Sequence, residues 1–292
     1  MVKETTYTNF IYTHIKSLPS EFRWQRTPVQ VYPLDFISKY LILPTPLLKA
    51  DYHFIVYLSK GSFYQQVGIE TYHVTSLSVL FVPEGEAFSI KSVGDDLCGF
   101  FILLENKTVT AITGKMELTD FITINTKLVP DAQSNDWINS LCKLLFAEVS
   151  SENPQRNIGS GLLQALLFKL KDLSGSKKVF SRQNEVANRF KNLVTKHYQT
   201  KKALAFYAQE LNVSENYLNR CVRSRFNKSC KKVIQETTIL QSQILMFNST
   251  KDIGEISLEV GYDDRSYFSR LFKKITGVTP TEFKKQIMHG LS

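Results

Sequence analysis

A basic helix near the C-terminus is the first stretch of this sequence whose side chains could bind a partner. Residues 261–285 read GYDDRSYFSRLFKKITGVTPTEFKK. Its apolar residues follow the i, i+3, i+4, i+7 spacing of one helix face: Phe268, Leu271, Phe272 and Ile275. Hydroxyl and basic side chains lie elsewhere around the same helix: Arg265, Ser266, Ser269, Arg270 and Lys273. This pattern gives either an ordinary solvated helix or a basic surface that attracts an anionic partner.

Capping signals set the limits of this helix and begin another one. Asp263 or Asp264 can accept backbone N–H bonds at its start. Gly277 stands just past its end, where a left-handed residue is commonly needed. Thr279 followed by Glu282 is the pattern of a capping box. We therefore expect a short helix, a tight stop and a second helix.

Charge is unevenly distributed along the chain, which has 292 residues and a net charge of +9. Residues 1–176 hold 15 Lys and Arg against 17 Asp and Glu, whereas residues 177–292 hold 21 against 10. This contrast indicates a polyanion as partner of the C-terminal third, the alternative being a basic surface without a ligand. The length suggests two domains.

Several kinds of site find no support in the residue patterns. The four cysteines form no CxxC pair and no zinc-finger spacing, so free thiols in a reducing cytoplasm fit best. The strand region holds His53 and His73 without an HxH, and no P-loop or GxSxG occurs. We therefore expect no metal, no cofactor and no catalytic residue. No apolar run reaches about 18 residues and no signal peptide begins the chain, so we expect a cytoplasmic protein without a membrane partner.

Strand signals dominate residues 29–105. Short β-branched and aromatic runs, namely HFIVYL, VLFVP and LCGFFILL, are separated by turn residues such as SKGS and PEGEA. These runs predict a sandwich or a small barrel.

Two helical segments with apolar stripes follow, at 134–149 and 157–173. The first stripe is predicted to contain Trp137, Leu141, Leu144 and Leu145. The second contains six leucines: Leu162, Leu163, Leu166, Leu167, Leu170 and Leu173. Either helix could simply cover the barrel. The second stripe is also wide enough for a partner subunit, so we expect 158–173 to contribute to a homodimer.

A polar, basic run, SGSKKVFSRQN at 174–184, is the predicted linker between domains 1–173 and 185–292. Beyond it the pattern is helical, with roughly seven short helices. An apolar stripe in the middle of this domain predicts one linking helix of about four turns. Its members are Val233, Thr237, Leu240, Ile244 and Phe247.

The C-terminal domain contains an internal repeat on either side of the linking helix. LNVSENYLNR at 211–220 aligns with VGYDDRSYFSR at 260–270. Asn212 matches Gly261 and Ser214 matches Asp263, after which the second copy carries one extra residue. Each copy follows a short amphipathic helix, and each turn contains Gly or Asn, which tolerate positive φ. This is helix-turn-helix organisation, present twice.

The last ~105 residues resemble the DNA-binding domain of the AraC/XylS family of bacterial transcription regulators. The most specific match is IGEISLEVGYDDRSYFSRLFKKITGVTPTEFKK, and the first copy matches at AQELNVSENYLNR. The first copy departs at Val222, where the family has a large aromatic, and at Asn227, where it has glycine. The linking helix lacks the family's customary arginines. VYLSKGSFYQQ and VLFVPEGEAFSI resemble, more loosely, the cupin-like sensor domain of this family.

The resemblance implies an α+β fold. A cupin-like β-barrel with flanking helices would precede an all-α domain with two helix-turn-helix motifs joined by a linking helix. It implies a transcription regulator, an activator rather than a repressor, whose partners are double-stranded DNA, RNA polymerase and a small-molecule effector in the barrel. The alternatives are a regulator whose barrel only dimerises and a cupin-type enzyme with an accessory DNA-binding domain. The effector-binding residues cannot be named, because the register of the strands is not set by the sequence.

The resemblance also assigns candidate DNA contacts. Contacts to bases are expected from Asn216, Asn219, Arg220, Arg265, Ser266 and Arg270. Contacts to phosphate are expected from Arg223, Lys228, Lys273 and Lys274. Arginine suits guanine and asparagine suits adenine, whereas phosphate contacts fix the register of a protein on DNA. The alternative for each residue is a solvated side chain or an intradomain ion pair with Asp263 or Asp264.

Overall fold

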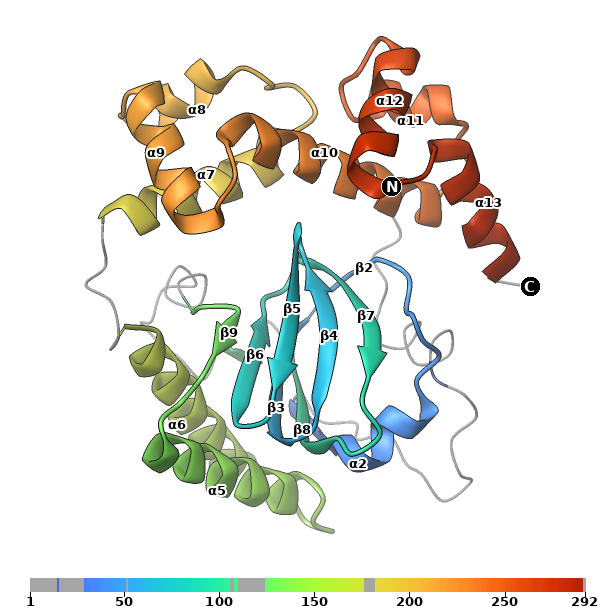
Figure 1. Ribbon diagram of the computed structural model, residues 1–292. Coiled ribbons are helices and arrows are strands. Elements are labelled where there is room, and N and C mark those ends of the chain that lie inside the picture. Colours follow the sequence, from blue (N-terminus) through green and yellow to red (C-terminus); the bar gives the residue numbers. More distant parts are fainter. Residues whose placement is uncertain are drawn as a thin grey trace. The chain divides into compact units, whose positions relative to one another are not determined.

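The computed structural model describes residues 15, 29–50, 52–105, 108–109, 124–175 and 182–290 (Figure 1). The chain forms two compact units, one ending at Lys177 and the other beginning at Lys178. Among the described residues, no helix is long and apolar enough to cross a membrane.

Two antiparallel sheets build the first unit. One has the strand order β1-β8-β3-β6-β9 and the other the order β2-β7-β4-β5. The strands are β1 (Val29–Pro33), β2 (Leu48–Lys49), β3 (His53–Lys60), β4 (Ser62–Val67), β5 (Glu70–Thr75), β6 (Ser78–Val82), β7 (Ala87–Val93), β8 (Cys98–Leu104) and β9 (Lys127–Leu128). The helical elements are α2 (Leu34–Ile37), the 3-10 turn η1 (Ser38–Tyr40), α5 (Ala132–Val149) and α6 (Arg156–Gly175). The three runs predicted as strands are β3, β6 and β8, so the β-rich fold is confirmed.

Strand β3 separates the space between the sheets from the helices, because side chains alternate between the two faces of a strand. Phe54 and Val56 point between the two sheets. Ile55 and Tyr57 pack instead in the core that the five-stranded sheet shares with α5 and α6. Tyr57 Oη donates to Asn135 Oδ1 at 3.0 Å, which ties α5 to the sheet. Burial raises the pKa of Tyr57 to about 12.

The leucine stripe of α6 covers this sheet. Its central leucines, Leu163, Leu166, Leu167 and Leu170, are buried to within 1% of complete burial. These four leucines are therefore unavailable to a partner subunit, and a homodimer through residues 158–173, which stays a prediction, would have to use other side chains of this helix. A wide apolar stripe cannot by itself distinguish a dimer interface from a helix that fully covers a sheet.

The predicted inner face of α5 is also wrong in part. Ile138, Cys142 and Leu145 point into the core, whereas Trp137 and Leu144 are 43% and 56% exposed. Apolar residues occupy more than half of the circumference of this helix. Their spacing therefore allows two faces, and only the sheet decides which one is buried.

Seven helices lie in the described part of the second unit. They are α7 (Arg182–His197), α8 (Leu204–Glu210), α9 (Glu215–Phe226), α10 (Cys230–Asn248), α11 (Ile253–Glu259), α12 (Arg265–Thr276) and α13 (Pro280–Gly290). Because α6 continues to Gly175 and α7 begins at Arg182, both ends of the predicted linker are helical. The remaining linker residues, 176–181, lie outside the described residues.

The stop and restart of the chain between α12 and α13 follow the predicted caps. Asp264 Oδ1 accepts the backbone N–H groups of the first turn of α12. Gly277 ends that helix with a φ of 86°, in the left-handed region. Thr279 Oγ1 accepts the Glu282 N–H at 3.2 Å, and Glu282 Oε2 accepts the Thr279 N–H at 2.7 Å. The capping box is thus confirmed.

The apolar face of α12 is confirmed as well. Phe268, Leu271 and Phe272 are buried in one core cluster with residues of α10 and α11, and Ile275 packs against that cluster. The linking helix α10 has 19 residues and so is about 28 Å long, longer than the four turns predicted.

Candidate nucleic-acid interface and ligand cavity

Helices α9 and α12 are equivalent elements of the two repeat copies. Each has 12 residues, begins at a side-chain cap and ends at a left-handed residue. The caps are Ser214 and Asp264, so Ser214 corresponds to Asp264 and the extra residue of the second copy is Asp263. This corrects the sequence alignment by one position. It also places Glu215 of α9 where α12 has Arg265.

The structure places the candidate residues of α12 on its exposed surface. Arg265, Ser266, Arg270, Lys273 and Lys274 are all exposed. Within the described residues, no ion pair joins the arginine at the start of this helix to either neighbouring aspartate.

The Arg265 guanidinium lies instead beside the start of α11. A Cβ added at Gly254 would be 3.8 Å from Arg265 Nη1. The backbone N–H of Glu255 is the main cause that lowers the pKa of the nearby Asp252, and the charge of Arg265 lowers it further.

The candidates of the first copy divide into two groups. Asn216, Arg220 and Arg223 are exposed, and the Arg220 guanidinium lies 5.2 Å from the centroid of the Tyr217 ring. The other two, Asn219 and Lys228, make contacts inside the unit. Eight of the ten candidate DNA contacts are therefore on exposed side chains, and two are not.

Asn219 and Lys228 connect α9 to the start of α10. Asn219 Oδ1 accepts the backbone N–H of Cys230 at 3.1 Å. Lys228 Nζ forms an ion pair with Glu236 at 2.8 Å. Both side chains thus hold the junction between two helices.

A basic groove lies between the start of α10 and one side of α12, and it was not predicted. Its volume is about 710 Å³, and it is lined by Ser229, Lys231, Lys232, Gln235, Glu236, Tyr267, Arg270, Leu271, Lys274 and Ile275. Gln235 Nε2 donates to Tyr267 Oη across it at 3.3 Å. Lys231 and Lys232 stand in the first turn of α10, where the helix dipole disfavours cations. The run KSCKK carried this signal in the sequence.

Lys202 fastens the turn of the second copy to the rest of the unit. Its Nζ donates to the Val260 carbonyl at 2.7 Å, to Thr238 Oγ1 at 3.1 Å and to the Tyr198 carbonyl. It also lies 4.5 Å from the centroid of the Tyr262 ring. Burial lowers the pKa of this lysine to about 8.

Gly261, in the turn of the second copy, packs directly against the backbone of Gln199. Its φ is 79°, and an added Cβ would lie 1.8 Å from the carbonyl oxygen of Gln199. Only glycine fits this position without moving the backbone.

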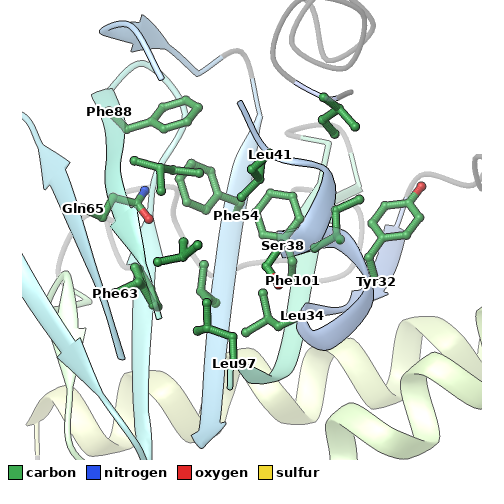
Figure 2. Close-up of a pocket in the computed structure, with 15 residues that line it drawn as sticks. Tyr32, Leu34, Ser38, Leu41, Phe54, Phe63, Gln65, Phe88, Leu97 and Phe101 are labelled. Atoms are coloured by element: carbon green, nitrogen blue, oxygen red, sulfur yellow. The ribbon is translucent and has the colours of Figure 1, made fainter. Parts of the chain in front are cut away.

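The first unit contains an apolar cavity between its two sheets (Figure 2). The cavity has a volume of about 60 Å³. Its lining comes from both sheets and from the segment that follows β1, and includes Tyr32, Leu34, Phe54, Phe63, Phe88 and Phe101. Figure 2 shows Gln65 of β4 directed into this space. The side chain of Gln65 is 2% exposed, and its Nε2 has no hydrogen-bond partner within the described structure.

Metal ligands are not gathered anywhere in the described part of the chain: no group of three His, Cys, Asp or Glu residues could hold an ion there. The part of the cavity lining that the structure describes holds no charged residue and no histidine.

Comparisons with known proteins match both units. The family model of an AraC-like ligand binding domain matches residues 49–170, and that of a helix-turn-helix domain matches residues 207–286. The Msm operon regulatory protein of Streptococcus mutans is 33% identical over 131 residues, 44% of this chain and 46% of that protein. The chain thus spans about half the length of that relative.

Two longer matches cover most of this chain. The HTH-type transcriptional activator RhaR of Mannheimia succiniciproducens is 21% identical over 262 residues, 88% of this chain and 93% of that protein. Among solved structures, ToxT from Vibrio cholerae bound to an unsaturated fatty acid is 20% identical, with a TM-score of 0.44 over 90% of this chain and 97% of that one.

Proposed function

We propose that this chain, which belongs to the AraC/XylS family of transcription regulators, binds double-stranded DNA in a sequence-specific way and activates transcription. The observation that carries the proposal is the equivalence of α9 and α12. Two capped helices of equal length expose arginine, asparagine and serine side chains in the unit that holds the excess of positive charge. Helices of this kind read base edges in the major groove.

The exposed residues of the two helices divide between bases and phosphates. Asn216, Arg220, Arg265 and Ser266 are proposed to contact bases, because they stand in the first two turns of their helices. Arg270 stands at the position equivalent to Arg220, but it lines the basic groove and is therefore proposed to contact phosphate instead of a base. Arg223 and Lys273 lie further along and are proposed to contact phosphate. Asn219 and Lys228 already bind inside the unit, so we propose that they support the fold of the first copy.

The basic groove supports a contact with a DNA phosphate between the two proposed recognition helices, α9 and α12. Arg270 and Lys274 face Lys231 and Lys232 across it. The groove also holds the Glu236 carboxylate, which pairs with Lys228 and lies 3.9 Å from Lys232 Nζ. Four cations against this one carboxylate still favour a phosphate group of the DNA backbone. The length of α10, about 28 Å, is close to the ~34 Å of one DNA turn, which suits two adjacent major grooves.

The first unit is proposed to bind a small-molecule effector and to form a homodimer. The cavity supports effector control over a barrel that only dimerises. The exposed apolar residues of α5 and α6 support dimerisation through the outer side of these helices: Trp137, Leu144, Ile158 and Phe168. A cytoplasmic location and contact with RNA polymerase complete the proposal, on the grounds of family membership.

The dimer is tested by changing Leu144 and Phe168 together to glutamate. The double variant is expected to sediment as a monomer with an unchanged circular dichroism spectrum, whereas the parent sediments as a dimer. Leu166→Lys serves as the comparison, because this buried residue should unfold the unit instead. A parent protein that sediments as a monomer at micromolar concentration contradicts the dimer.

DNA binding is tested with the full chain on fragments of the genome from which the chain comes. We expect selection to yield one sequence and footprinting to protect two adjacent turns on one face of the helix. The variant with Arg265 and Ser266 both changed to alanine should lose protection over one of these turns. A full chain that binds all fragments equally at physiological salt contradicts sequence-specific binding.

A further inference from the structure

We infer that the cavity of the first unit takes an uncharged, mainly apolar molecule that carries one hydrogen-bond acceptor, held by Gln65 Nε2. The inference rests on the proposed function in so far as it names the chemical class of the effector. Three observations carry it: the walls of the cavity, the unpaired amide and the volume of the space.

The walls exclude charged molecules. Among the described residues, no lysine, arginine, aspartate, glutamate or histidine lines the cavity. A carboxylate or an ammonium group that enters such a space without an opposite charge loses its hydration and gains no partner. The exposed Lys91, between lining residues Ile90 and Val93, is not itself part of the lining.

The walls also exclude molecules with many hydroxyl groups. Of the lining residues that the structure describes, those with polar side chains are Gln65, Ser38 and Tyr32. Tyr32 Oη already donates to Gln30 Oε1 at 2.7 Å. A sugar would therefore bury most of its hydroxyl groups without partners, which is unfavourable.

Gln65 is the polar group that selects the ligand. It lies on the inward face of β4, between the buried Phe63 and Val67. The great majority of buried polar atoms in proteins are hydrogen-bonded, so a buried amide nitrogen without a partner requires an explanation. Figure 2 shows this amide directed into the cavity near Phe54 and Phe88. A carbonyl, ester or ether oxygen of a ligand would accept its N–H.

The volume limits the size of the ligand to a small molecule. At about 60 Å³, the cavity is several times larger than the roughly 10–15 Å³ that one water needs on the same scale. An apolar cavity of about 150 Å³ accepts benzene, so a ring compound can enter this smaller cavity only if its walls move apart. The aromatic rings of Phe54, Phe88 and Phe101 offer edge-to-face contacts to such a ring.

The test uses three probes of similar size: acetophenone, ethylbenzene and benzoate. Their dissociation constants are measured by calorimetry with the full chain. Acetophenone differs from ethylbenzene by the acceptor, and benzoate differs by its charge. We expect both neutral probes to bind and benzoate to bind at least about tenfold more weakly than acetophenone.

Gln65→Leu then isolates the amide. The ratio of acetophenone affinity to ethylbenzene affinity is expected to fall about tenfold in this variant, the effect of one lost hydrogen bond to a buried donor. Gln65→Met, which keeps the volume of the side chain, should give the same fall. Gln66→Leu is the matched control, because Gln66 is the next residue of β4 and its Nε2 donates to the Gly68 carbonyl outside the cavity. It should leave the ratio unchanged.

Three results would overturn the inference: benzoate binding as tightly as acetophenone, a ratio that Gln65→Leu and Gln65→Met leave unchanged, or no binding of either neutral probe at millimolar concentration. DNA affinity is measured in the same samples. If the neutral probes bind with the expected ratios and the affinity for DNA does not change, the inference holds and effector control is what fails.

Discussion

The two helix-turn-helix copies share a backbone plan but hold their turns in different ways. In the first copy the turn contains Asn212 with a φ of 52°, and in the second it contains Gly261 with a φ of 79°. The second turn is also pressed against the Gln199 carbonyl and fastened by Lys202. Equivalent elements of one domain have thus been stabilised by local conformation in one case and by tertiary contact in the other.

The copies also differ in charge at the first residue of the exposed helix. Glu215 suits that position, because a carboxylate interacts favourably with the positive end of the helix dipole, whereas Arg265 does not. Arg265 gains nothing from the dipole of its own helix; inside the unit its charge acts on Asp252, at the start of α11. We expect the second copy to depend on this residue for recognition, and the first copy to depend on Asn216 and Arg220.

The largest effect should come from the turn of the second copy. Gly261→Ala should reduce the stability of α11 and α12 by at least about 3 kcal/mol, because a Cβ cannot fit against the Gln199 carbonyl. Hydrogen-exchange protection factors of amides in these helices measure this change. Asn212→Ala, at the equivalent position, should cost the first copy only about 1 kcal/mol. Equal losses in the two copies would show that the contact with Gln199 carries no energy.

The next largest effect should be a loss of specific DNA binding, and only the change in the second copy should cause it. Arg265→Ala should cost about 1–3 kcal/mol of binding to the specific site and relax the preference at one base pair. Glu215→Ala should cause no loss and should strengthen binding to any DNA slightly, since a negative charge is removed from the interface. Affinities for the selected site and for a scrambled site decide the matter. If Arg265→Ala weakens both sites equally, this arginine contacts phosphate.

Loss of the lysine contact should have a smaller effect on stability that depends on pH. Lys202→Met should lower the protection of α11 and α12 by about 1–2 kcal/mol, since acceptors of Nζ lose their donor. Burial lowers the pKa of Lys202 from 10.5 to about 8, so between these pH values the unfolded chain binds more of this proton. Stability from this group should therefore rise as the pH increases through that range.

The advantage of the parent over Lys202→Met is accordingly expected to be greater at pH 9.5 than at pH 7.5. The comparison uses protection factors corrected for the intrinsic exchange rates at each pH. An advantage that shrinks at the higher pH contradicts the direction of the shift.

The smallest effects should be equal in the two copies. Lys273→Ala and Arg223→Ala stand at equivalent positions and should each weaken binding to specific and scrambled DNA alike. Each should reduce the slope of log affinity against log salt by about 0.9. Lys196→Ala, an exposed lysine of α7 outside both recognition helices, is the control and should leave the slope unchanged. If either variant alters the base preference, that residue contacts a base and not a phosphate.

Local signals in the sequence predicted the second copy almost completely. The caps at Asp264, Gly277 and Thr279 and the apolar face of α12 depend on neighbouring residues, so their spacing is sufficient to identify them. The first copy was predicted less well, because Asn219 and Lys228 bind groups on α10 that lie 11 and eight residues away. Asparagine and lysine suit a contact with DNA and a contact inside the unit equally well, so the residue type alone does not distinguish the two roles.

The first unit shows more clearly which features local signals in the sequence cannot predict. HFIVYL identified β3, but which of its side chains point between the sheets depends on the pairing of β3 with β6 and β8. For the same reason Gln65 of β4 could not be identified as a cavity residue, although it lies in the region where strands were predicted. The buried face of α5 and the covered stripe of α6 likewise depend on the sheet beneath them.

The linking helix α10 fixes a direction as well as a distance. It joins two proposed recognition helices that carry different side chains, such as Glu215 and Arg265, within a single chain. The sequence that these two helices are proposed to read would accordingly not be a palindrome, and its left and right ends would differ. One copy of the protein would therefore bind a promoter in one direction only. One base pair inserted between the half-sites would rotate them by roughly 34–36°, given the ~10–10.5 base pairs of a DNA turn, so we expect it to weaken binding by a single chain.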